Sequence, residues 1–251
     1  MITVEDASLV GFGELFTRAY QTQKGLLPLG NTTDLKISHT EEEKKLPNFS
    51  TGVGNRNSFG RITGVTCSFT MYDVNARNLA LMGRGTIKGV AAAPVVDELH
   101  TCEAVPGELI PFNALPDMSV TVTVKTAGDV ELAPGTDYIL TPYGIQLTSG
   151  TTATAAGVKV SYTSLKANVV QMLTTAQVEL EVYFAGLNAA QGGAPTPARL
   201  RRFKVGLVQE IALSGSDYAA YNLTGELLAD PLIVASDMSQ FYELGDAAKA
   251  V

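Results

Sequence analysis

The clearest pattern in the sequence is an alternation of apolar and polar residues that ends at Tyr72. Apolar side chains occupy one face, at Val65, Cys67, Phe69 and Met71, and polar side chains occupy the other, at Thr66, Ser68, Thr70 and Tyr72. A period of two is typical of a β-strand with one buried face. The segment Gly60–Tyr72 is therefore predicted to be a strand on the surface of a core.

A short helix is predicted directly after this strand. Asp73 is a residue type that caps helix N-termini, and Leu79 and Met82 then fall on one side of a helix. Gly83 and Gly85 follow as stop signals. The remaining pattern is that of strands, so the chain is predicted to be mainly β.

Two more strands and a loop are predicted upstream. Gly13–Gln21 has the pattern of a first strand, and Thr33–Lys45 that of a second, which becomes charged toward its end. Leu46–Ser58 is rich in Pro, Gly, Asn and Ser and is predicted to be a long loop. The charges that lead to a glycine-rich tip indicate a hairpin that projects beyond the body of the fold.

The alternation returns in residues 176–188. Val178, Leu180, Val182 and Phe184 are predicted to be buried, and Gln177, Glu179, Glu181 and Tyr183 to face away from the core. A Gly/Pro loop and further strands follow this segment.

The middle third has a different composition. Leu115–Leu165 is rich in Thr and Val, with short alternating segments separated by turn residues. We interpret residues 104–166 as a small inserted β module. Residues 1–103 and 167–251 are then the two halves of one domain.

Composition and charge narrow the function. The 251 residues carry 25 acidic and 18 basic side chains, a net charge of −7. A protein that grips nucleic acid through its phosphates is usually basic, so tight DNA or RNA binding is disfavoured. The N-terminal residues lack a signal-peptide pattern, and no apolar run approaches the roughly 20 residues of a membrane helix. We therefore expect a protein made and folded in the cytosol, with no membrane partner.

Candidate chemistry is sparse. His39, His100, Cys67 and Cys102 are all the His and Cys residues of the chain. His100 and Cys102 could point to one side of a strand, but structural zinc needs about four such ligands. Neither histidine has a nucleophile at a diagnostic position. We expect no enzyme activity, no metal and no cofactor, and we expect the thiols to be reduced.

Two charged clusters remain without a role. Glu41, Glu42 and Glu43 precede two lysines, and Arg199, Arg201 and Arg202 precede Phe203. They are either solvated strand ends or complementary rims that join copies of the same protein.

The order of these segments resembles a known family. "GELFTRAYQTQKGLLPLGNTTDLKISHTEEEKKLPNFSTG" followed by "ITGVTCSFTMYDVNARNLALMGRG" resembles the N-terminal half of the tail tube proteins of long-tailed bacteriophages. "YFAGLNAAQGGAPTPARLRRFKVGL", "LTGELLADP" and "SQFYEL" resemble the C-terminal half. The match covers about Gly13–Gly85 and Gln177–Leu244, which leaves out the middle module.

The resemblance implies a β-sandwich flanked by one short α-helix, with a long inter-ring loop. It implies that hexameric rings stack into a hollow tube in the virion, through which the genome passes into the host without specific binding. The implied partners are other copies of the chain, together with tape measure, tail terminator and distal tail or baseplate proteins. The inserted module is expected on the outside of the tube, where space is not limited.

On this interpretation the candidate residues fall into two sets. The lumen set is Glu179, Glu181 and Gln177, because an acidic wall repels the phosphates of DNA. The contact set between subunits or rings is Glu41, Glu42, Glu43, Phe49, Asn55, Arg56, Arg199, Arg201 and Arg202. Ordering the Leu46–Ser58 loop against the adjacent ring would bring the arginines of one copy to the glutamates of another.

Two alternatives stay open. One is a carbohydrate-binding or adhesion module, although the chain has no Trp to form an aromatic binding surface. The other is a virion shell or decoration protein.

Overall fold

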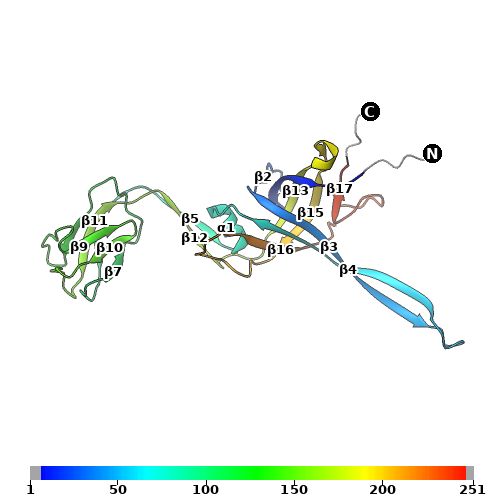
Figure 1. Ribbon diagram of the computed structural model, residues 1–251, viewed down its shortest axis with the longest axis horizontal. Coiled ribbons are helices and arrows are strands. Elements are labelled where there is room, and N and C mark those ends of the chain that lie inside the picture. Colours follow the sequence, from blue (N-terminus) through cyan, green and yellow to red (C-terminus); the bar gives the residue numbers. More distant parts are fainter. Residues whose placement is uncertain (1–6, 247–251) are drawn as a thin grey trace. The chain divides into compact units, whose positions relative to one another are not determined.

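The computed structural model describes residues 7–246 and is mainly β, with 49% of residues in strands and 4% in helices. This confirms the predicted fold class. The chain divides into two compact units. The main unit contains the described residues up to Thr86 and from Val170, and the inserted unit is Ile87–Val169 (Figure 1).

The main unit is built on a nine-stranded antiparallel sheet. Its strands are β1 (Gly11–Ala19), β2 (Leu27–Pro28), β3 (Thr32–Pro47), β4 (Asn55–Met71), β13 (Glu179–Asn188), β14 (Ala194–Pro195), β15 (Ala198–Val205), β16 (Tyr221–Leu227) and β17 (Tyr242–Leu244). Their order is β2-β1-β13-β15-β16-β4-β3, with β14 beside β13 and β17 beside β15. The sheet curls, because β1 and β3 lie close together although four strands separate them in this order.

One hydrophobic core fills the curl of this sheet. The alternation that predicted the strand at Gly60–Tyr72 is confirmed, since Val65, Cys67, Phe69 and Met71 are all buried. Phe203 of β15 packs against Phe69, with ring centroids 6.2 Å apart. Burial raises the pKa of the Cys67 thiol to about 12, so this cysteine stays protonated.

The helix α1 (Ala76–Met82) is confirmed, but its predicted cap is wrong. The cap is Asn75, whose side-chain oxygen accepts a hydrogen bond from the backbone N–H of Asn78 at 3.0 Å. The Asp73 carboxylate instead accepts from the backbone N–H of Asn31 at 2.9 Å, which fixes the turn before β3. Both residues are good capping types, and only the one three positions before a helical N–H can cap it. A short 3-10 helix, η1 (Ala189–Gln191), follows β13.

The hairpin of β3 and β4 corrects the predicted loop Leu46–Ser58. The two strands pair as far as Pro47 opposite Asn55, so only residues 48–54 form the turn. Asn48 holds this turn, because its backbone N–H donates to the Gly54 carbonyl and its carbonyl accepts from Gly52. Gly52 and Gly54 have positive φ angles of 70° and 72°, which a glycine adopts at low cost. The Gly and Asn residues of the segment therefore shape a tight turn within a longer hairpin.

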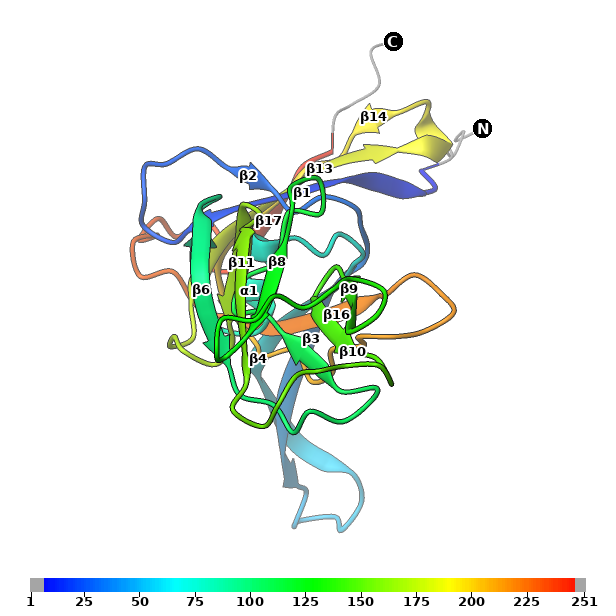
Figure 2. The same cartoon turned by 90° about the vertical axis from the view of Figure 1, so that its left-hand side faces the viewer.

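The inserted unit is a small two-sheet domain. One sheet contains β7 (Leu109–Pro111), β10 (Gly144–Leu147) and β9 (Tyr138–Thr141). The other contains β6 (Pro94–His100), β11 (Val158–Thr163) and β8 (Thr123–Thr126). In Figure 2, β6, β11 and β8 of this sheet lie side by side. The sheets share one core, which includes Ile110, Val124, Leu132, Ile145, Val158 and Val160.

The unit begins earlier than residue 104, the expected start of the module. The reason is that β6 pairs with β11, with His100 opposite Val158, and so belongs to the inserted sheet. Its end at Val169 lies close to the expected Lys166. The ribbon of β5 (Thr86–Val90) and β12 (Ala167–Gln171) carries the chain into and out of the unit.

Candidate functional site

A feature that projects from the main unit is the far half of the β3–β4 hairpin, residues 40–62, which we call the outer hairpin (Figure 1). β16 pairs with β4 only between Thr66 and Met71, and β3 pairs only with β4. Within the described residues, no other strand therefore borders the outer hairpin. An isolated two-stranded ribbon is marginally stable in water at best. Because its outer edges are unpaired, the backbone groups along them, together with the exposed side chains, are available to a partner.

Large apolar side chains are exposed along this ribbon. Phe49 and Val53 at the turn are 82% and 78% exposed, and Phe59 and Ile62 on β4 are 63% and 61% exposed. Among the predicted contact residues, Glu41, Glu42, Glu43, Phe49, Asn55 and Arg56 all lie in the outer hairpin and are exposed. The structure thus brings this part of the predicted contact set together on one projecting element.

A second feature is a set of ion pairs on the side of β13 that faces away from the core. Arg202 of β15 donates two hydrogen bonds to Glu179, at 2.8 and 3.0 Å. The hydrogen bond from Arg202 lowers the pKa of Glu179. The Arg202 guanidinium also lies 5.3 Å from the ring centroid of Tyr20, whose hydroxyl donates to Asp230 at 2.6 Å. Glu179 is therefore held in place by a strand neighbour.

Glu181 is paired more tightly. Arg18 of β1 and Arg199 of β15 each donate to its carboxylate at 2.7 Å, from opposite sides. Desolvation alone would raise the pKa of Glu181, but the hydrogen bonds from Arg18 and Arg199 outweigh it and lower the pKa. Two guanidinium groups thus share one half-buried carboxylate.

These pairs change the electrostatics expected for the lumen set. Glu179 and Glu181 do lie opposite the buried Leu180 and Val182, as the alternation predicted, whereas Val178, which was also predicted to be buried, precedes β13 and is 39% exposed. Their negative charges are balanced by arginines of the same chain, so this face is not acidic. The side-chain amide of Gln177 donates a hydrogen bond to the Val205 carbonyl at 2.7 Å, which ties Gln177 to the adjacent strand.

The arginines of the predicted contact set also have internal partners. Arg199 and Arg202 hold Glu181 and Glu179, as described above. Arg201 is buried and pairs with Glu243 of β17 at 2.6 Å. Within one chain these arginines therefore contact its own carboxylates. No sequence signal could have given these partners, because they depend on the register between strands. The expected contact with Glu41–Glu43 of another copy stays a prediction.

A substitution at Glu181 tests how much this ion-pair network contributes to the free energy of unfolding. Since the folded pKa of Glu181 is lowered, its stabilisation is present above the unfolded value of about 4.5 and is lost as pH falls through the folded pKa. Glu181→Gln is expected to lower the free energy of unfolding near pH 7 by about 1–3 kcal/mol, because two arginines lose a charged acceptor. Urea unfolding of both proteins from pH 7 to pH 3 measures this. The two curves should converge at acid pH, and parallel curves would contradict the assignment.

Both histidines lie beside polar side chains of the same chain. His39 lies 3.0 Å from the Tyr242 hydroxyl, and His100 lies 3.3 Å from Glu98. The Tyr162 hydroxyl donates to Glu98 at 2.7 Å, and burial with this bond raises the pKa of Tyr162 to about 12. Within residues 7–246, no group of three or more His, Cys, Asp or Glu side chains is arranged to hold a metal ion.

The sequence comparisons give a family. A model described as "Protein of unknown function UCP028589" matches residues 8–245. The chain belongs to this family. The match includes the residues of the inserted unit. No curated protein matches the sequence. In the part of the chain that the structure describes, no helix is long and apolar enough to cross a membrane.

Proposed function

We propose that this protein is the structural subunit of a bacteriophage tail tube, in which hexameric rings stack into a conduit for the genome. The observation that carries the proposal is the outer hairpin, together with the resemblance of the flanking sequence to tail tube proteins. A projecting ribbon with exposed apolar side chains is the kind of element that becomes stable when another copy covers it.

Simple magnitudes support a contact role for the outer hairpin. Full burial of a large apolar side chain contributes about 1.5–3 kcal/mol relative to its exposed state. Phe49, Val53, Phe59 and Ile62 are all available for such burial. Repetition of one contact around a ring multiplies the gain, whereas a monomer obtains none of it.

The free edge of β3 supports the same role. β3 is the edge strand of the main sheet, and its outer side has no pairing partner in the described residues. Natural proteins seldom leave a long edge strand open, because it pairs with other chains. An ordered assembly of identical subunits covers such an edge in a controlled way. The balanced charges around Glu179 and Glu181 would then give a wall that neither binds nor strongly repels DNA.

Negative-stain electron microscopy of the purified chain tests the proposal. Hollow tubes or stacked rings of uniform diameter are the expected result. Isolated particles at every protein and salt concentration would contradict it and favour a decoration or adhesion protein.

The inserted unit is proposed to decorate the outside of the tube and to be dispensable for assembly. Gly85 lies beside Val170 and Gln171, so the main chain can be closed across the ribbon after Thr86. A variant with Ile87–Val169 replaced by Asn-Gly, a favoured two-residue hairpin turn, is expected to fold and still form tubes. Cutting at residue 103 instead leaves β6 without its partner β11 and serves as the control that should misfold. Electron microscopy of tube diameter is the measurement, and a folded but monomeric variant would place the unit in the ring interface.

A further inference from the structure

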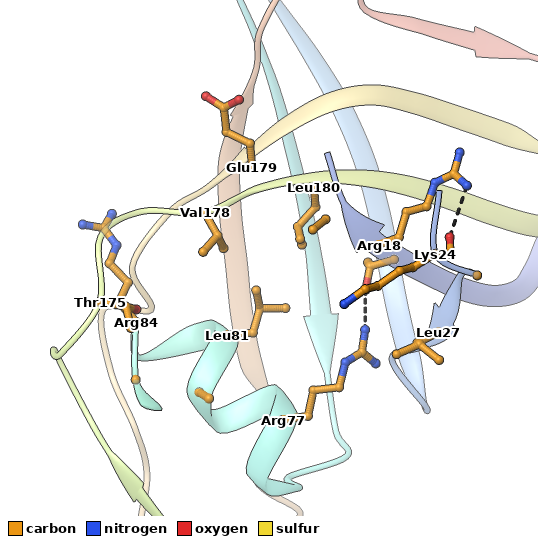
Figure 3. A pocket seen from close by; sticks show the side chains of 15 residues that line it. Arg18, Lys24, Leu27, Arg77, Leu81, Arg84, Thr175, Val178, Glu179 and Leu180 are labelled. Carbon is orange, nitrogen blue, oxygen red and sulfur yellow. Dashed lines mark hydrogen bonds between the residues drawn. The ribbon is translucent and has the colours of Figure 1, made fainter. Parts of the chain in front are cut away.

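A cavity of about 400 Å³ lies in the main unit between β1, β2, α1 and the start of β13 (Figure 3). Apolar side chains line part of it, among them Leu27, Leu81 and Val178. Leu27 and Val178 are 54% and 39% exposed, so the apolar lining reaches the surface. The volume falls within the range of about 300–1,000 Å³ that is typical of ligand pockets, which is enough for a few side chains.

Positive charge surrounds this apolar lining. Arg18, Lys24, Arg77 and Arg84 line the cavity, and the only acidic lining residue in the described part of the chain is Glu179, which Arg202 already holds. Arg77 is committed to the Pro28 carbonyl and the Thr17 hydroxyl. Burial lowers the pKa of Arg77.

Two of these cations remain available. The Nε atom of Arg84 is buried and has no hydrogen-bond partner among residues 7–246. No hydrogen bond or ion pair between described residues uses the Lys24 ammonium group, although its backbone carbonyl accepts from Arg18. A buried donor without an acceptor is costly, so the cavity is suited to an occupant that brings a carboxylate with apolar neighbours.

The loop between β15 and β16, residues 206–220, has these properties. Leu213 and Tyr218 are each 93% exposed, and Asp217 next to Tyr218 is also exposed. The base of the loop is held, because Val208 donates to the Met82 carbonyl and the Tyr221 hydroxyl donates to the Ala212 carbonyl. The tip is therefore presented from a fixed base, which lowers the entropy cost of binding.

β2, which borders the cavity, and the loop that leads into β16 are well separated in Figure 2. A chain with two complementary surfaces of this kind joins head to tail, and such contacts close into rings when the rotation allows. We propose that the tip of this loop in one copy docks into the cavity of the next, with Asp217 at Arg84 and with Leu213 and Tyr218 on the apolar lining. This inference rests on the proposed function, since it names the contact between neighbours.

Charge reversal on each side tests the contact. Arg84→Glu and Asp217→Arg are each expected to weaken self-association by about tenfold or more, because like charges then meet in the contact. The double variant should regain most of the association. An equimolar mixture of the two single variants should regain it as well, because alternating copies restore complementary charges at every head-to-tail contact. Sedimentation velocity over a protein concentration series is the measurement.

Matched controls separate this contact from general charge effects. Asp237→Arg changes the same charge on another exposed loop, near the exposed Leu232 and Val234, and should leave association unchanged. If Arg84→Glu does not fold, as judged by circular dichroism, Lys24→Glu takes its place at the same cavity. Association of Asp217→Arg equal to that of wild type overturns the proposal, as does a double variant that stays as weak as Arg84→Glu.

Self-association of the wild-type chain distinguishes failure of the proposed function from failure of the loop contact. A wild-type protein that never self-associates contradicts both the proposed function and the loop contact. Self-association that Asp217→Arg leaves at the wild-type level overturns the loop contact alone, and the proposed function stands. Self-association that ends in dimers or open chains, and that Asp217→Arg abolishes, supports the loop contact and contradicts the closed rings of the proposed function.

Discussion

Shortening the outer hairpin is expected to abolish assembly and leave the main unit folded. The variant removes residues 44–59 and joins Glu43 to Gly60 through Asn-Gly, because these two residues already face each other in the β3–β4 register. None of the removed residues belongs to either core. The free energy of unfolding should therefore stay within about 1 kcal/mol of wild type, whereas rings or tubes should be absent.

Finer substitutions separate the apolar from the ionic part of this effect. Phe49→Ser with Val53→Ser should weaken assembly at every salt concentration, since apolar contact is little affected by screening. The matched control is Val96→Ser with Ile139→Ser, an exposed apolar pair of the inserted unit, which should assemble normally.

The acidic run of the hairpin contributes through charge alone. Changing Glu41, Glu42 and Glu43 to Gln should weaken assembly at low salt and converge with wild type at high salt. Each ion pair between copies that is lost should weaken assembly by about 1 kcal/mol or less. The reason is that Glu43 and Glu42 already lie near Lys45 and Arg61 of the same chain, at 3.1 and 3.9 Å. Equal assembly of both proteins at all salt concentrations would show that the run is a solvated strand segment. Tubes formed by the shortened hairpin would contradict the proposed role of the whole element.

The parts of the fold that could be predicted are those whose signal is local. The strand before Tyr72 has a polar and an apolar face, and burial of the apolar face fixes its period. The helix was predicted for the same reason, whereas its cap was misplaced because Asp73 and Asn75 are both good capping residues. The length of the paired strands in the outer hairpin was underestimated. Gly and Asn residues occur near a turn both in long loops and in hairpins whose strands extend to the turn.

Features that depend on distant partners could not be predicted. The inserted unit begins at Ile87 because β6 pairs with a strand about 60 residues later, and such pairing leaves no mark in the local pattern. The glutamates of β13 were correctly placed away from the core. Their neutralisation by Arg18, Arg199 and Arg202 follows from the strand order and register, which a single sequence does not specify.

Phe203 is the core position where a single truncation should have the largest effect on stability. Its side chain is fully buried, packs beside Phe69 with the two rings tilted, and fills the space above Gly225 of β16, where any added Cβ would meet the ring. Phe203→Ala is expected to cost about 3–5 kcal/mol, because the lost contacts leave a cavity that three strands cannot close. That is a large part of the roughly 5–15 kcal/mol that stabilises a typical domain.

The consequence of this truncation should reach the surface of the main unit. Arg202 and Lys204 flank Phe203 on β15 and point to the other face, where Arg202 holds Glu179. A cavity on the core side of β15 should therefore disturb the Arg202–Glu179 ion pair on its outer side. It should impair assembly along with stability. Thermal unfolding followed by calorimetry measures the loss, and Phe203→Leu is the control with a smaller cavity. The transition of the inserted unit should not move, since its core contains none of these residues. A loss below about 1 kcal/mol in the main unit would mean that the core around Phe203 repacks, contrary to the close contacts that surround this ring.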